Sequence, residues 1–233
     1  MILTNDQIVE AQEGGGITID PFDPNQVQAA TYDLRVGAQG ATTSTKTLID
    51  LEKAGYMTLE PGDFGVVTCF ETIRLSPQYA ARFGLRAKYA RKGLVATTGP
   101  QIDPGYYGRL IVGITNLTPK PVSLQFKSDF VSVEFHHLEK PSTKPYNGPY
   151  QNKVTLGEDE IEFITETEGM ALSEMLTTLR SLTQNVGALT TQMGTFERVL
   201  ESRMKAFEWI IGIGLGFVAL AVGVISVITA LKH

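Results

Sequence analysis

The sequence contains one cysteine, Cys69, among its 233 residues, so no disulfide can form within a chain. Disulfides persist mainly in oxidising compartments, and their exclusion favours a reducing one. Cys69 stands in the apolar run FGVVTCF and is expected to be a buried core thiol. The opening residues MILTNDQIVE lack the basic start and long apolar core of a signal peptide, so none is expected. Positive charge is also scarce, and the net charge of −5 gives no reason to expect a nucleic-acid partner.

Charged side chains are missing from residues 209–231 (WIIGIGLGFVALAVGVISVITAL). As a helix with a rise of about 1.5 Å per residue, this stretch would span about 34 Å, more than the ~30 Å hydrocarbon core of a bilayer. A buried core helix of that length would normally keep a polar face. The sequence therefore predicts one C-terminal transmembrane helix. Three basic residues lie between positions 198 and 205, whereas only Lys232 and His233 follow the span, which places the preceding domain in the cytoplasm.

Residues 1–155, here called the head, carry all 11 prolines and several short segments of alternating polarity. These segments are TYDLRVG (31–37), FGVVTCF (64–70), GRLIVGITN (108–116) and DFVSVEFHHL (129–138). Turn signals such as Pro61-Gly62-Asp63 separate them. One short helix is expected in NDQIVEAQ, with Thr4 or Asn5 as its N-cap. Many short strands without a sustained helical pattern predict a mainly β head, built as an antiparallel barrel or sandwich.

Residues 156–169 (LGEDEIEFITETEG) hold six acidic residues and no basic ones. Such a composition is typical of a solvated linker, in which IEFI could form one strand. We therefore expect an acidic linker between the head and the residues that follow.

Residues 170–208 show apolar residues that recur every seven positions in two series. The series are Leu172, Leu179, Val186, Met193, Leu200 and Phe207, and Met175, Leu182, Leu189 and Phe196, which Arg203 interrupts. This heptad pattern predicts a coiled-coil stalk, although a lone amphipathic helix packed on the head would also explain it. The core residues do not discriminate two strands from three. Gly212 and Gly216 then form a GxxxG pattern that supports association of the predicted transmembrane helices.

Three clusters in the head carry side chains suited to a ligand. In YDLR, Asp33 and Arg35 interrupt an apolar strand, although an outward-facing pair at a strand edge would explain them. The run LRAKYARKG holds four cations that could bind phosphate, or could form a solvated helical face. In QIDPGYYG, Asp103 at a tight turn could bind a sugar hydroxyl with aromatic rings behind it, although Asp commonly opens turns.

The order of these motifs is similar to that of the dCTP deaminase and dUTPase superfamily. The segments are ATYDLRVG (30–37), LEPGDFGVV (59–67), RAKYARKGL (86–94), IDPGYYG (102–108) and ITN (114–116). ILTNDQI and PFDPNQVQAATYDLRVG (21–37) resemble the dCTP deaminase branch most. The resemblance covers about residues 1–152 and implies a dUTPase-like distorted β-barrel. It also implies a homotrimer with sites at the subunit interfaces, a deoxynucleotide ligand, and Mg²⁺ as a companion of that ligand.

The resemblance implies roles for individual residues. Asp103 matches the acid that holds the deoxyribose hydroxyl, and Arg91 would join it in catalysis if the protein is active. Asp33 matches the first dUTPase motif, and Tyr146, Tyr150 and Gln151 resemble the arm that closes over the nucleotide. The implied nucleotide-binding set is Arg86, Lys88, Arg91, Gln101, Ile102, Asp103, Tyr106, Tyr146 and Gln151.

The departures from the family pattern concern the residues that perform chemistry. Gly113 stands where deaminases need a general acid/base Glu, and a glycine cannot move a proton. Ala87 and Lys88 replace two serines, while Phe130 and Val133 replace the Arg and Gln of dUTPases. The glycine-rich dUTPase arm is missing. Glu134 is the nearest candidate in the sequence to replace the lost Glu.

Three functions follow from this pattern. The leading hypothesis is a membrane-anchored, catalytically degenerate module that binds a deoxynucleotide or related nucleotide as a sensor or effector, for example in defence against phage. The second is a tethered but working enzyme of nucleotide metabolism, either a dCTP deaminase or a dUTP diphosphatase. The third is a structural scaffold with an inactive pocket.

Overall fold

The computed structural model describes residues 1–166 and 172–230, except for the side chains of residues 172–177, 179, 217, 221 and 224–230. The chain divides into two compact units, Met1–Leu176 and Thr177–His233. The first unit is mainly β, as predicted, and the second is helical.

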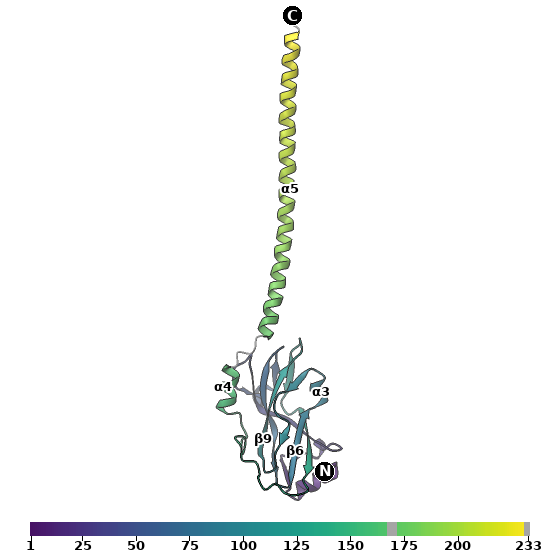
Figure 1. The fold of residues 1–233 in the computed structure, drawn as a ribbon, viewed down its shortest axis with the longest axis vertical. Coiled ribbons are helices and arrows are strands. Elements are labelled where there is room, and N and C mark those ends of the chain that lie inside the picture. The colour runs from purple at the N-terminus through teal and green to yellow at the C-terminus, as the bar shows by residue number, and fades with distance from the viewer. Residues whose placement is uncertain (167–171, 231–233) are drawn as a thin grey trace. The chain divides into compact units, whose positions relative to one another are not determined.

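The elements of the first unit alternate long strands with short helices (Figure 1). The strands are β1 (Ile17–Asp20), β2 (Tyr32–Thr42), β3 (Ile49–Asp50), β4 (Tyr56–Leu59), β5 (Phe64–Leu75), β6 (Tyr79–Leu85), β7 (Leu94–Ala96), β8 (Gln101–Ile102), β9 (Tyr107–Asn116), β10 (Val122–Gln125) and β11 (Asp129–His137). The helices are α1 (Asn5–Glu13), α2 (Leu51–Ala54), α3 (Ala87–Ala90) and α4 (Glu158–Glu166), with a 3₁₀ turn at Pro24–Gln26.

Nine strands form one antiparallel sheet in the order β7-β9-β5-β2-β11-β6-β8, to which β1 and β3 add by pairing with β5 and β2. A separate two-stranded sheet joins β10 to β4. The large sheet curls into a half-barrel (Figure 1). Because β2 pairs with both β5 and β11, it lies inside the sheet. The interpretation of Asp33 and Arg35 as an edge pair is therefore wrong.

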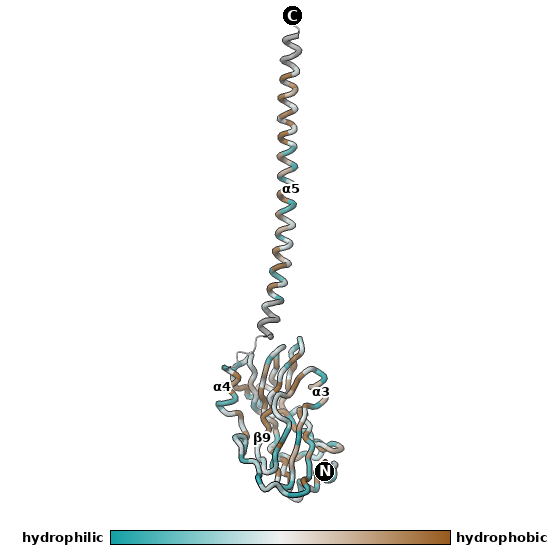
Figure 2. The backbone as a smooth tube through the Cα atoms, viewed as in Figure 1, coloured by the Kyte–Doolittle hydropathy of each residue, from teal (hydrophilic) through white to brown (hydrophobic). Residues whose placement is uncertain are grey.

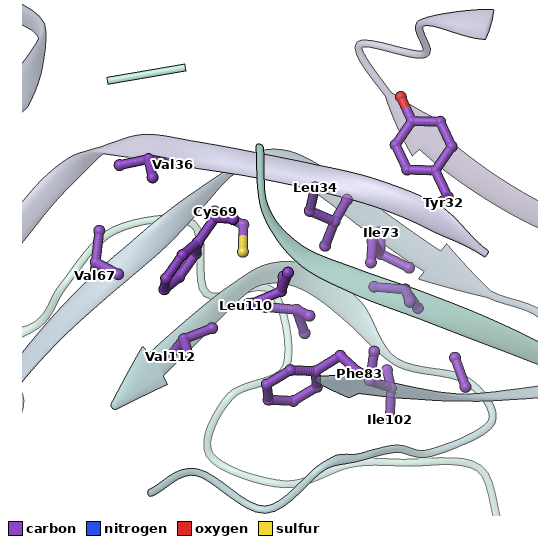
Figure 3. Packing of buried hydrophobic residues seen from close by; sticks show 14 of the residues in the cluster. Tyr32, Leu34, Val36, Val67, Cys69, Ile73, Phe83, Ile102, Leu110 and Val112 are labelled. Atoms are coloured by element: carbon purple, nitrogen blue, oxygen red, sulfur yellow. The ribbon is translucent and has the colours of Figure 1, made fainter. Parts of the chain in front are cut away.

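The concave side of the half-barrel holds the core. Leu34, Cys69, Leu110 and Val112 are buried there and gather in one cluster (Figure 3). Alternation along β9 sends Leu110, Val112 and Ile114 to the same side, as expected for a strand with period 2. Cys69 is fully buried, as predicted, and burial raises the pKa of its thiol well above the ordinary value.

The predicted N-terminal helix is present as α1. Thr4 is its N-cap, and the backbone N–H of Thr4 donates to Oε1 of Gln7, which forms one half of a capping box. Ile8 and Ala11 are buried on its inner face.

The acidic segment after the head contains helix α4 instead of the strand expected in IEFI. Three acidic residues in its first turn favour a helix start, because negative charge stabilises a helix N-terminus. Ile164 is fully buried and forms a small second hydrophobic cluster with Leu156, Ala41 and Val66. This part of the segment is therefore packed against the sheet, which composition alone did not indicate.

The described part of the second unit belongs to one long helix, α5, which as a whole runs from Leu172 to Ala230. Apolar residues recur along α5 (Figure 2). The described heptad side chains are exposed in the single chain, namely Leu182, Val186, Leu189, Met193, Phe196, Leu200 and Phe207. The coiled coil needs further chains and stays a prediction. Leu172, Met175 and Leu179 have side chains outside the described residues.

The predicted transmembrane helix is not found. Within the described residues, no helix is long and apolar enough to cross a membrane. Residue 231, and the side chains of residues 217, 221 and 224–230 within the predicted span, lie outside what the structure describes.

Candidate functional site

A cavity of about 680 Å³ lies against β5, β8 and β9, and its size suits a small organic ligand. Its lining residues come from five parts of the first unit: the sheet, the loop 97–99, the Asp103 turn, the arm 145–153 and helix α4. They are Phe64, Val66, Phe83, Thr97, Thr98, Gly99, Gln101, Ile102, Asp103, Tyr106, Leu110, Ile111, Gly113, Tyr146, Tyr150, Asp159, Glu160 and Phe163. Most of this surface is apolar or aromatic, and three carboxylates interrupt it.

The turn that carries Asp103 is fixed by its backbone. Gly105 has φ of +86°, a left-handed conformation that glycine adopts readily, and an added Cβ would meet the Cβ of Pro145 at 2.5 Å. The N–H of Tyr106 donates to the carbonyl of Asp103 at 3.1 Å. Among described residues, the Asp103 carboxylate has no hydrogen-bond or ion-pair partner, so its oxygens are free to accept from a ligand hydroxyl.

The arm 145–153 closes one wall of the cavity. The N–H of Tyr146 donates to the carbonyl of Pro104 at 2.7 Å, and its ring lies 5.8 Å from that of Tyr106. Tyr150 also lines the cavity. These rings give the wall flat apolar faces against which a planar base could stack.

Gln151 has a different place from the one expected. Its amide donates to the carbonyl of Gly105 at 3.0 Å and accepts from the N–H of Tyr107 at 3.0 Å. It does not line the cavity. Gln151 therefore holds the arm against the Asp103 turn. Its effect on a ligand would be indirect, through the position of the arm.

Tyr106 is a neutral wall of the cavity. Its hydroxyl donates to the carbonyl of Arg109 at 2.9 Å, and burial raises the pKa of this phenol far above its ordinary range. Tyr106 therefore offers a ring face and no proton-accepting group near neutral pH.

Position 113 lies in the cavity wall, as the family pattern implies, and a side chain there would displace a neighbouring side chain. A Cβ there would meet Thr97 Oγ1 at 2.6 Å and Phe64 Cε2 at 3.3 Å. The N–H of Gly113 donates to Thr98 Oγ1 at 2.6 Å. A glutamate at this position would therefore require the Thr97 hydroxyl to move.

The predicted phosphate-binding cations do not meet Asp103 within one chain. Arg86 forms an ion pair with the buried Asp33, and its NH1 lies 3.6 Å from Asp129 Oδ2. The Lys88 ammonium lies 5.2 Å from the centre of the Tyr89 ring. None of Arg86, Lys88 and Arg91 lines the cavity. Helix α3, which follows Arg86, and helix α4 lie on opposite flanks of the first unit (Figure 1).

Glu134, the suggested replacement for the missing Glu, does not lie at the cavity of its own chain. Glu134 lies on β11 opposite Arg82 of β6, and its Oε1 is 3.0 Å from Nε2 of His136. It does not line the cavity. Phe130 and Val133, which replace the expected dUTPase residues, are both fully buried in the core.

Among the lining residues that sequence reasoning missed are all those contributed by α4, namely Asp159, Glu160 and Phe163. The sequence feature that could have predicted them is the apolar pair Leu156 and Ile164. These two residues flank the acidic run and are eight positions apart, a spacing that suits one face of a helix. For metals, the described residues contain no group of three or more His, Cys, Asp or Glu side chains able to hold an ion.

Comparison with known proteins places these features in a family context. A dCTP deaminase-like family model matches residues 2–138, which ends before the arm and α4. The dCTP deaminase of Pyrococcus furiosus is 34% identical over 140 residues, covering 60% of this chain and 88% of that protein. The dUMP-forming dCTP deaminase of Aquifex aeolicus is 28% identical over 163 residues, covering 66% and 91%. The solved 2′-deoxycytidine 5′-triphosphate deaminase of Agrobacterium tumefaciens shares 21% identity with a TM-score of 0.49, over 58% of this chain and 47% of that one.

Proposed function

Because this chain belongs to the dCTP deaminase-like family, we propose that its head binds a deoxynucleotide at the cavity around Asp103 without deaminating it. The observation that carries the second part is Gly113, since the strand position that lines the cavity bears no acid, and an added Cβ would meet Thr97 Oγ1 at 2.6 Å. Deamination needs a group that moves protons between water and the amine. A cavity that keeps the carboxylate of Asp103 and its aromatic wall but has no acid at position 113 favours binding over turnover.

In this proposal each wall of the cavity takes one part of the ligand. Asp103 accepts a hydrogen bond from the deoxyribose hydroxyl, and Tyr106, Tyr146 and Tyr150 contact the base. Gln101 and Ile102 border the same surface. Arg86, Lys88 and Arg91 lie elsewhere in the chain, so they contact the phosphates only if a neighbouring subunit of a homotrimer supplies them. Mg²⁺ would accompany the phosphates, and its ligands would come from the nucleotide and water.

We further propose that α5 joins three heads through its heptads and holds them at a membrane with the heads in the cytoplasm. The support is the row of exposed apolar heptad residues and the further exposed apolar side chains between Trp209 and Val222. Both leave large apolar surface that a single chain in water would not retain. A tethered head that binds a nucleotide without consuming it suits a sensor or effector, for instance in defence against phage.

An active enzyme is the second candidate, because relatives at 33–35% identity are dCTP deaminases. In that case Asp103 and Arg91 would take part in turnover by a dCTP deaminase or dUTP diphosphatase. Two carboxylates of α4, Asp159 and Glu160, are then the acids that line the cavity besides Asp103.

Nucleotide binding is tested by thermal unfolding of the full chain in detergent micelles with dCTP or dUTP and Mg²⁺. A ligand at one hundred times its Kd stabilises the folded state by about 2.7 kcal/mol, which raises Tm by several degrees. We expect this rise in the wild-type protein and its loss in Asp103→Ala. Glu139→Ala, an exposed change outside the cavity, should keep it. An equal rise in Asp103→Ala would show that the site is misplaced.

Membrane attachment is tested by ending the chain at residue 208. We expect the full chain to sediment with membranes and the shortened chain to stay in the supernatant, because residues 209–231 supply the uncharged segment. Alkaline carbonate washing separates inserted from surface-bound protein. A full chain that remains in the supernatant would disprove the attachment and leave nucleotide binding untouched.

A further inference from the structure

The acidic helix α4 contributes charge to the cavity that the family match does not include. Asp159, Glu160 and Phe163 line the cavity, together with Asp103 from the turn on the sheet side. No lysine, arginine or histidine lines it in the described part of the chain. In one chain the cavity is therefore lined by three carboxylates, of which Glu160 is paired with Lys153.

Helix α4 is held in this place by contacts on both sides of the acidic turn. The N–H of Leu156 donates to Gln39 Oε1 at 2.9 Å, and Leu156 and Ile164 are buried against Ala41 and Val66. The ring of Phe163 meets that of Phe64 edge to face at 5.7 Å. These contacts join α4 to strands β2 and β5, so its carboxylates have a defined position beside the cavity.

Glu160 is oriented by two hydrogen bonds. Lys153 Nζ donates to Oε1 at 2.5 Å, and the N–H of Gly157 donates to Oε2 at 2.7 Å. Although burial opposes it, these bonds lower the pKa of Glu160, so the group is ionised at neutral pH. Asp159 has no such counter-ion among the described residues, and its side chain is the more exposed of the two.

A phosphate chain carries several negative charges, whereas the nucleoside to which it is attached carries none. Two like charges 4 Å apart repel by about 1 kcal/mol even in water, and by more beside a protein surface. We propose that Asp159 and Glu160 are specificity-determining residues that weaken binding of a phosphate chain at this cavity relative to the nucleoside. The inference rests on the proposed function, because it concerns the ligand of the same site.

Any cation that binds phosphate there must overcome this repulsion. Arg86, Lys88 and Arg91 would do so only from a neighbouring subunit, and Lys153 is already paired with Glu160. Neutralising Asp159 therefore removes a repulsive charge without releasing a cation, while neutralising Glu160 also frees Lys153.

The test compares the affinities of deoxycytidine and dCTP for the full chain in detergent micelles by isothermal titration calorimetry. Asp159→Asn should strengthen dCTP binding about fivefold or more, as expected for one repulsive contact, and leave deoxycytidine within twofold. Glu160→Gln should act in the same direction. Glu158→Gln and Glu162→Gln change exposed acids of the same helix that do not line the cavity, and they should leave both affinities unchanged.

Salt gives a second readout that does not depend on folding of a variant. Screening shortens the range of repulsion from about 10 Å at 0.1 M to about 3 Å at 1 M. The affinity for dCTP relative to that for deoxycytidine should therefore rise with salt more in the wild-type protein than in Asp159→Asn. An unchanged ratio of the two affinities in both α4 variants would overturn the inference while leaving the proposed function intact. Binding of neither ligand to the wild-type protein would overturn both.

Discussion

Replacing Arg35 with Leu should lower the free energy of unfolding of the head by about 3–5 kcal/mol, because it leaves a buried carboxylate without its partner. Glu71 is fully buried on β5, and its two oxygens accept from Nε of Arg35 at 2.6 Å and from the backbone N–H of Arg35 at 2.9 Å. The guanidinium also lies over the Phe70 ring at 5.0 Å and 3.5 Å from Asp23. The measurement is urea unfolding of the full chain in detergent, followed by near-ultraviolet circular dichroism.

The double variant Arg35→Leu/Glu71→Leu is the control that isolates the unpaired charge. It should recover most of the lost stability, since an apolar pair of similar volume often replaces a buried ion pair without loss. Lys53→Ala, which breaks the exposed pair with Asp50, should cause no measurable change. A loss in the double variant as large as in Arg35→Leu would show that the packing of the arginine, and not the charge of Glu71, carries the effect.

The same single variant should show a distinct dependence on pH. Burial raises the pKa of Glu71 above its ordinary value, even though hydrogen bonds from Arg35 oppose the shift, and removal of Arg35 raises it further. Between the unfolded and folded pKa values, the folded state of this variant binds more protons than the unfolded state. Its stability therefore falls as pH rises through the folded pKa, so the deficit should be smallest in acid and greatest at neutral pH.

Restoring the missing acid should fail. Gly113→Glu should lower the free energy of unfolding by about 3 kcal/mol, because it overpacks a closed wall and places a carboxylate in it. The Cβ would meet Thr97 Oγ1 at 2.6 Å, so something must shift before the rest of the side chain can be accommodated.

The matched control removes the obstructing hydroxyl. Gly113→Ala should be destabilising in the wild-type background and better tolerated in Thr97→Ala, where Oγ1 is gone. If Gly113→Glu is as stable as the wild-type protein, the wall around position 113 is looser than these contacts indicate.

The residues that the sequence suggested on the sheet side, Gln101, Ile102, Asp103 and Tyr106, border one cavity because their signals are local. The Asp-Pro-Gly turn, the alternation of β9 and the glycine at position 113 each depend on neighbours in the chain. The contacts of Asp33 and Arg35 could not be predicted from neighbouring residues in the chain. Their partners, Arg86 and Glu71, are distant in sequence and meet them only after the sheet has curled.

Helix α4 shows why composition misled. Six acids in fourteen residues indicate solvation on average, but the apolar residues Leu156, Phe163 and Ile164 pack this segment against the sheet. The cations near α3 show a different difficulty. Their spacing suggested a phosphate site, but a linear sequence does not indicate which cavity a short helix faces.

The most direct test of the proposed function is turnover by the wild-type chain in detergent micelles with dCTP or dUTP and Mg²⁺, followed as release of ammonia and of pyrophosphate. We expect neither product above the level given by Asp103→Ala, in a sample that both nucleotides stabilise against heat. Release of ammonia or pyrophosphate that Asp103→Ala abolishes would contradict that expectation and make the protein a working enzyme despite Gly113.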